Sequence, residues 1–161
     1  MGRISEKNPR YRTKEEIAKD LAFVLASHLS YGTKYAVLAD ATWVWTEFYG
    51  KIRGCPHWSK MAIMQDKVNP RAKLRHEHAV PKKVVIELLM NLEPPTLDRV
   101  WDILNRFLIG VVVTPEEDAV LNSEFSSKMP PEFYDPKNPR YQDPLLRYKR
   151  YNIEVILRHN H

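Results

Sequence analysis

The stretch Val111-Val112-Val113-Thr114-Pro115-Glu116-Glu117 contains two different structural signals in succession. Three consecutive valines form a β-branched run that is too short for anything but a strand. The four residues that follow have the order of a helix start, with a capping threonine, a proline at the first position and a glutamate at the third. A strand that leads directly into a helix indicates a chain of mixed secondary structure.

The same order of strand and helix is predicted earlier in the chain. Lys73 to Val80 has the composition of a short extended segment, and Pro81 can occupy the first turn of a helix that continues to about Asn91. Near the other end, a short helix is expected at Leu145 to Arg150 and a third strand at Ile153 to Leu157. The strands are therefore few, short and widely separated.

The front half of the chain is predicted to be helical. Thr13-Lys14-Glu15-Glu16 has the order of a capping box, and apolar residues at helical spacing follow it as far as Tyr31-Gly32. Further helices are expected from Thr33 to Phe48, around Ser59 to Asp66, and from Leu97 to Leu108. Three short strands among five or more helices predict an α+β fold that is mostly helical.

Length and composition limit the class of protein. The 161 residues, 43% of them hydrophobic, suffice for one substantial core, so residues 1–161 are expected to form a single domain. The net charge of +5 favours an anionic partner such as DNA or RNA. The only cysteine, Cys55, has no partner for a disulfide within the chain, which predicts a cytoplasmic protein. No apolar run approaches the roughly 20 residues that span a bilayer, so no membrane association is expected.

The segment from Met129 to Pro144 contains five prolines, which predict a stiff wrapping segment without regular secondary structure. Arg-Tyr pairs occur at Arg140-Tyr141, Arg147-Tyr148 and Arg150-Tyr151, in this segment and after it. Arginine mixed with aromatic side chains is a common means of gripping single-stranded nucleic acid. The alternative is that the tyrosines pack in the core and the arginines are solvated.

The most compact chemical motif of the chain is Arg75-His76-Glu77-His78-Ala79-Val80-Pro81. If this segment is extended, His76 and His78 point to one face and Glu77 to the other, and two imidazoles a strand step apart can share one metal ion. If it turns at Val80-Pro81, Glu77 and His78 can instead converge on a metal-bound water. Both geometries are compatible with the sequence.

Within this motif, Glu77-His78-Ala79-Val80-Pro81 resembles the first motif of the HNH, or ββα-metal, endonucleases, in which an acidic residue directly precedes a histidine and a proline follows three positions later. The resemblance implies that His78 is the general base toward the water that attacks a phosphodiester, and that Glu77 helps to hold a divalent cation. His76 would support or orient them. The implied catalytic residues and metal ligands are thus His76, Glu77 and His78, with Mg²⁺ or Mn²⁺ favoured over Zn²⁺.

The sequence departs from the HNH pattern after this motif. The family continues through a loop and a second strand that bears an asparagine, whereas Pro81 to Leu89 here is predicted to be a helix. The paired Cys-x-x-Cys zinc knuckles of many HNH proteins are absent. Cys55-Pro56-His57 offers a thiol and an imidazole that could join His76 and His78 around zinc, but this spacing matches no common zinc module.

Two functional hypotheses follow. The first is a metal-dependent protein that cleaves nucleic acid. Its expected nucleic-acid contacts are Arg75, Lys82, Lys83, Arg140, Tyr141, Arg147 and Arg150. The second is a non-enzymatic interaction or regulatory protein that binds a protein or a nucleic acid through its Pro-rich and Arg-Tyr-rich C-terminal part. In that case the His-Glu-His run is a structural anchor, held by backbone donors or by Arg75 or Lys82.

Overall fold

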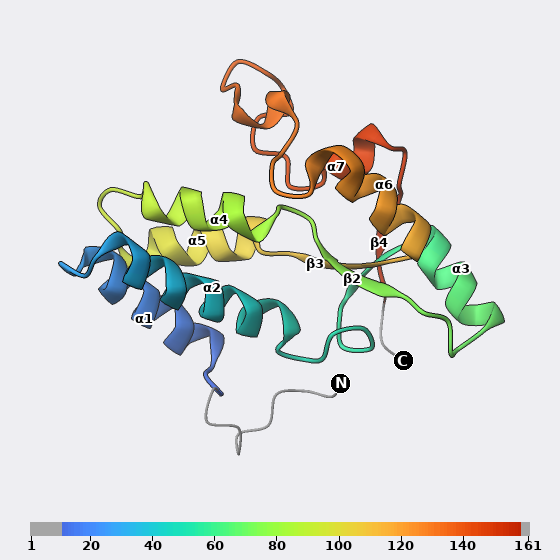
Figure 1. The fold of residues 1–161 in the computed structure, drawn as a ribbon, viewed down its shortest axis with the longest axis horizontal. Helices are drawn as coiled ribbons and strands as arrows, with labels where there is room; N and C mark the ends of the chain where they lie inside the picture. Colours follow the sequence, from blue (N-terminus) through green and yellow to red (C-terminus); the bar gives the residue numbers. More distant parts are fainter. Residues whose placement is uncertain (1–10, 159–161) are drawn as a thin grey trace.

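The structure is a computed structural model of the chain and describes residues 11–158. Figure 1 shows the course of the chain and labels its elements. The elements follow one another in the order α1 (Lys14–Ala26), α2 (Tyr31–Glu47), β1 (His57–Ser59), α3 (Lys60–Val68), β2 (Arg75–His78), α4 (Lys82–Met90), α5 (Leu97–Phe107), β3 (Gly110–Val113), α6 (Pro115–Phe125), a 3₁₀ helix (Pro131–Tyr134), α7 (Leu146–Arg150) and β4 (Val155–Leu157).

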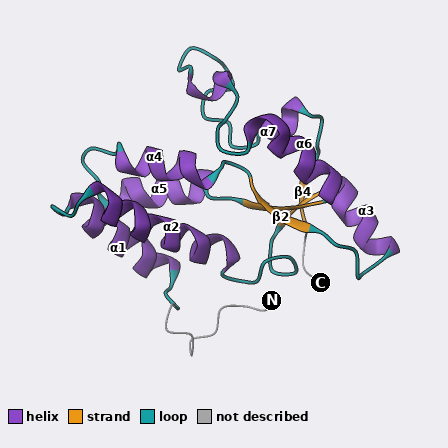
Figure 2. Ribbon diagram, in the orientation of Figure 1, coloured by secondary structure: helices purple, strands orange, loops and turns teal. Residues whose placement is uncertain are grey.

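The four strands form one mixed sheet with the order β2-β3-β1-β4, drawn in orange in Figure 2. β3 pairs antiparallel with β2 and parallel with β1, and β1 pairs antiparallel with β4. All four residues of β3 are buried. Because both faces of this strand are covered, none of its side chains faces solvent, and this accounts for its three consecutive valines. β2 and β4 are left as the two edges of the sheet.

The two faces of the sheet pack against different partners, because successive side chains of a strand point in opposite directions. On one face, Val111 and Val113 pack with Leu121 of α6 and Tyr148 of α7. On the other face, Val112 packs with Trp58 of β1 in a cluster that also contains Cys55 and Ala62. This division decides where each side chain of the neighbouring strand β2 lies.

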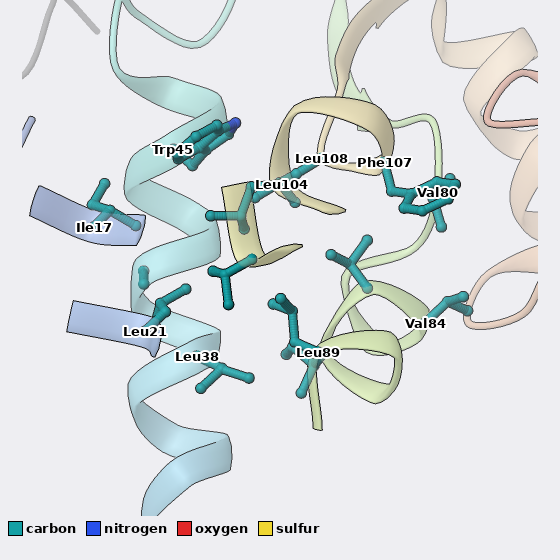
Figure 3. Close-up of a cluster of buried hydrophobic side chains, with 14 of the residues drawn as sticks. Ile17, Leu21, Leu38, Trp45, Val80, Val84, Leu89, Leu104, Phe107 and Leu108 are labelled. Atoms are coloured by element: carbon teal, nitrogen blue, oxygen red, sulfur yellow. The ribbon is translucent and has the colours of Figure 1, made fainter. Parts of the chain in front are cut away.

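The largest buried cluster joins the helices that Figure 1 shows beside the sheet, namely α1, α2, α4 and α5. Its side chains recur at helical spacing, as do Ile17, Leu21 and Leu25 on α1. Figure 3 shows the centre of the cluster, where Leu38, Leu89 and Leu104 come from three different helices. The helices are thus held to one another by a continuous apolar interior.

The Pro-rich segment at 129–144 contains the 3₁₀ helix between stretches of irregular backbone. Met129 and Phe133 are buried in the main cluster, and the Phe133 ring meets the Phe107 ring at 5.8 Å with an interplanar angle of 70°. Edge-to-face aromatic contacts of this kind stabilise beyond the area they bury. The segment is therefore fixed to the helical part of the protein at its start.

The predicted α+β fold is confirmed, with three differences of detail. The Pro-rich segment, which was predicted to lack regular secondary structure, contains the 3₁₀ helix Pro131–Tyr134. The sheet has a fourth strand, β1, that the local sequence did not predict. The first two helices separate at 27–30 and not at Tyr31-Gly32, because the Ser30 side chain accepts a hydrogen bond from the Thr33 amide and so caps α2. No helix within residues 11–158 is both long enough and apolar enough to cross a membrane.

Candidate nucleic-acid interface

Strand β2 carries the His-Glu-His run in the extended conformation. Its register with β3 places His76 opposite Val112, Glu77 opposite Val111 and His78 opposite Gly110. The His76 and His78 rings lie on one face, with their centroids 5.3 Å apart and their planes at 89°. Glu77 points to the other face, where α6 and α7 pack. Glu77 and His78 therefore do not converge in this conformation.

The Glu77 carboxylate is paired with Arg147 of α7, whose side chain is fully buried. Arg147 Nη1 donates to Glu77 Oε1 at 2.8 Å and to the His78 carbonyl oxygen at 3.0 Å. Its Nη2 donates to the Leu121 carbonyl oxygen at 3.3 Å. One guanidinium thus ties β2, α6 and α7 together through charge-assisted hydrogen bonds.

The prediction that Arg147 contacts nucleic acid is corrected by this geometry. Its side chain is 0% exposed and its charge is neutralised by Glu77 inside the protein, so a phosphate at the surface cannot reach it. Burial raises the pKa of Glu77, and the nearby Arg147 opposes that shift. The partner of Glu77 is therefore neither Arg75 nor Lys82, the cations nearest to it in the sequence.

The histidine pair fits closely against the sheet. A Cβ atom at Gly110 would collide with the His76 ring, so the glycine makes room for this imidazole. His78 Nε2 lies 3.1 Å from Thr46 Oγ1 of α2, while neither buried ring nitrogen of His76 has a hydrogen-bond partner within residues 11–158. Burial lowers the pKa of His76 to about 4 and that of His78 to about 3, so both rings are neutral at neutral pH.

Two cationic side chains lie near this histidine pair, and three more belong to β2 or to the segment before it. Lys51 and Lys82 lie close enough to lower the pKa of both imidazoles further. Arg71, Lys73 and Arg75 precede and begin the edge strand, and all three are exposed. The predicted contacts Arg75 and Lys82 therefore lie on β2 or close to it, together with three cations that were not predicted, namely Lys51 near the histidines and Arg71 and Lys73 before the strand.

The remaining predicted contacts lie elsewhere. Lys83, exposed on α4, is 4.0 Å from Glu87. Arg140 and Tyr141 are exposed in the Pro-rich segment, which Figure 1 shows projecting away from β2. Arg150 is 3.5 Å from Glu132, and its guanidinium lies over the Phe125 ring. The structure does not bring these four residues to the β2 edge.

The predicted metal ligands are not gathered into one group. Within residues 11–158, no set of three or more His, Cys, Asp or Glu side chains is arranged to hold a metal ion. Cys55 Sγ lies 3.1 Å from the Gly110 carbonyl oxygen and donates to it, and burial raises the pKa of this thiol to about 11. A metal at His76, Glu77 and His78 stays a prediction of the HNH resemblance.

Of the three cations that were not predicted, Arg71 and Lys73 could have been identified from the sequence, whereas Lys51 could not. Arg71 and Lys73 belong to the run from Lys67 to Arg75, which holds four basic residues and no acidic one. Such a run is a recognisable electrostatic feature. Lys51 lies in the connection between α2 and β1, and only the fold brings it near β2.

Comparisons with known proteins found no matching family model, no similar curated protein and no similar solved structure. The function is therefore inferred from the geometry and charge of the molecule.

Proposed function

We propose that this protein binds nucleic acid along the β2 edge of its sheet. The observation that supports the proposal is the concentration of cations there. No ion pair within residues 11–158 involves the four cations Arg71, Lys73, Arg75 and Lys82. Unpaired cations on an edge strand and in the segments that flank it are suited to the closely spaced phosphates of a polynucleotide.

The local charge balance strengthens the proposal. Residues 67–86 contain six basic side chains and a single acidic one, Glu77, whose charge is neutralised internally by Arg147, while one of the six, Lys83, is 4.0 Å from Glu87. The acidic residue just before this segment, Asp66, is also paired, because Arg53 and Arg158 both contact it. Basic side chains therefore outnumber acidic ones on β2 and in the segments next to it.

The histidine pair contributes chemistry of a different kind. Neutral imidazoles can donate or accept hydrogen bonds, and the ring nitrogens of His76 lack a partner among the described residues, but they are buried in this conformation. Phosphate contacts by the cations would set the position of the strand of nucleic acid. His76 and His78 lie near Lys51 and Lys82 but are largely buried, so the cations and not the imidazoles would make the first contacts with a bound strand.

A competing explanation of the same cations is protection of the sheet. Lys and Arg on an edge strand discourage pairing with the edge of another sheet and so prevent aggregation. Under this explanation, removing the charges promotes self-association and leaves affinity for nucleic acid unchanged. The two explanations therefore differ in a measurable way.

The test is the salt dependence of binding to labelled single-stranded and duplex DNA and to RNA, measured by fluorescence anisotropy. The triple variant Lys73→Ala, Arg75→Ala, Lys82→Ala should bind more weakly. In a plot of the logarithm of the binding constant against the logarithm of the salt concentration, its slope should be smaller in magnitude by about 2 to 3, because each lost phosphate contact removes about 0.7 to 0.9. The matched control Lys19→Ala, Lys128→Ala, Lys137→Ala removes the same charge from exposed positions outside the β2 edge. Equal weakening by both variants, or no binding by the wild type, would reject the proposal.

Cleavage of the bound strand is a further step that the HNH resemblance predicts. In the present conformation Glu77 faces away from His78, and the pKa of about 3 makes His78 a weak base at neutral pH. Cleavage by these two residues therefore requires β2 to rearrange. Incubation with Mg²⁺, Mn²⁺ or EDTA, comparing wild type with His78→Ala, tests this step separately from binding.

A further inference from the structure

An apolar stripe runs along the outer face of α3. Met61, Met64 and Val68 follow one another at intervals of three and four residues, so they share one face of the helix. Their side chains are 55%, 53% and 88% exposed. Val120 on α6 is also exposed, at 42%. Contiguous apolar exposure of this kind on a folded protein marks a surface for a partner.

The surface beside this stripe is hollowed. One cavity, of about 430 Å³, lies between α3, α6 and the chain leading to β4, and is lined by Met61 and Val120 among others. A second, of about 580 Å³, is lined by Met64, Val68 and residues at the start of α6. Both cavities are lined by Met61, Glu116 and Glu117. They therefore form one continuous groove between α3 and α6, called the α3–α6 groove below.

The charges of the α3–α6 groove are opposite in sign to those of the β2 edge. Three glutamates and one lysine line it, and the lysine, Lys60, is paired with Glu154 at 3.1 Å. The first turn of α6 is acidic throughout, with Glu116, Glu117 and Asp118. An apolar floor with an acidic wall is complementary to a ligand that has an apolar face and cationic flanks.

We propose that the α3–α6 groove binds a basic amphipathic helix of a protein partner. Two helices that flank an apolar groove accept a third helix through side chains at positions i, i+3 or i+4, and i+7. Two methionines on the floor suit this role, because their flexible thioethers adapt to different apolar side chains. The groove shares no residue with the β2 edge.

The test uses two synthetic helical peptides with the same pattern of leucines, one flanked by lysines and the other by glutamates, each labelled with a fluorophore. The groove should bind the Leu/Lys peptide at least about tenfold more tightly than the Leu/Glu peptide, a difference of about 1.4 kcal/mol. Met61→Ser combined with Met64→Ser should weaken the binding of the Leu/Lys peptide by about tenfold. Both methionines are exposed, so these changes spare the core.

The matched control is Phe23→Ser, which removes an exposed apolar side chain from α1, outside the groove. It should leave the affinity for the Leu/Lys peptide unchanged. Glu116→Gln should weaken that affinity by a few-fold while sparing the fold. The proposal is overturned if both peptides bind equally, if Phe23→Ser weakens binding as much as the methionine variant, or if sedimentation shows that a second copy of the chain occupies the stripe.

Discussion

At the scale of single residues, Glu77 and His78 are neighbours in sequence that belong to different environments. Glu77 is part of a buried ion pair with Arg147, whereas His78 faces α2 through its contact with Thr46. The alternation of a strand is sufficient to separate them. The carboxylate therefore holds β2 against α6 and α7, and the imidazole packs on the opposite face against α2.

Arg147→Met is predicted to lower the free energy of unfolding by about 3 to 5 kcal/mol at neutral pH, because it leaves Glu77 charged and unpaired. Without the guanidinium the pKa of Glu77 in the folded protein rises further above its ordinary value of 4.5. A carboxyl group whose folded pKa is raised loses stability as pH increases through that range. The free energy of unfolding, measured in urea, should therefore differ little between variant and wild type in acid, and the difference should grow as pH rises.

The double variant Glu77→Leu, Arg147→Met provides the control. Removing both charges should restore most of the lost stability, since apolar residues of similar size can replace a buried ion pair at little cost. A single variant that unfolds like the wild type at neutral pH would show that the pair does not hold β2 to the helices.

The buried histidines make stability depend on pH in the opposite sense. The folded protein keeps both rings neutral down to about pH 4 or below, while in the unfolded chain they take up protons near 6.5. The free energy of unfolding should therefore decrease as pH falls from about 6.5 towards 4, by up to about 1.4 kcal/mol per pH unit for each ring. His76→Asn combined with His78→Gln should flatten this dependence in urea titrations between these pH values. An unchanged slope would mean that neither ring is buried as described.

At the scale of elements, a single carboxylate links the starts of two helices. Glu117 Oε2 accepts a hydrogen bond from the Thr114 amide and so completes the capping box of α6. The same oxygen also accepts one from Ser59 Oγ, and Ser59 is the N-cap of α3. The two helices that form the α3–α6 groove are thus positioned relative to each other by one side chain.

Glu117→Ala is predicted to lower the free energy of unfolding by about 2 to 3 kcal/mol, because it removes hydrogen bonds at two helix starts. This loss exceeds the stabilisation that a single helix cap provides. Glu116→Ala is the matched control, since this neighbouring glutamate is exposed and makes no contact with Ser59. Thermal unfolding of the two variants measures the difference. Equal melting temperatures would contradict the proposed link between α3 and α6.

The helices and three of the strands could be predicted because their signals are local. The valine run and the Thr114-Pro115 helix start both lie within seven residues, and both are confirmed as β3 and α6. Strand β1 could not be predicted, because its three residues are stabilised by pairing with β3 and β4, far away in the sequence. The ion pair between Glu77 and Arg147 joins positions 70 residues apart, and no local pattern reveals it.

At the scale of the whole molecule, charge is segregated. The β2 edge is basic because its own acidic residue is neutralised from inside, and the α3–α6 groove is acidic because the first turn of α6 is. The chain as a whole carries a net charge of +5, which by itself favours any anion. The fold therefore separates the charges of the chain into a basic surface that favours anions and an acidic surface that favours cations.

The most direct measurement is a titration of the isotope-labelled protein with a short oligonucleotide, followed through backbone amide chemical shifts. Binding at the β2 edge predicts that the largest shifts fall on Lys73 to His78, Lys51 and Lys82, and decline when salt is added. Amides of the α3–α6 groove should move little. Shifts concentrated in the Pro-rich segment at 129–144, or spread evenly over the surface, would contradict the assignment of nucleic-acid binding to the β2 edge.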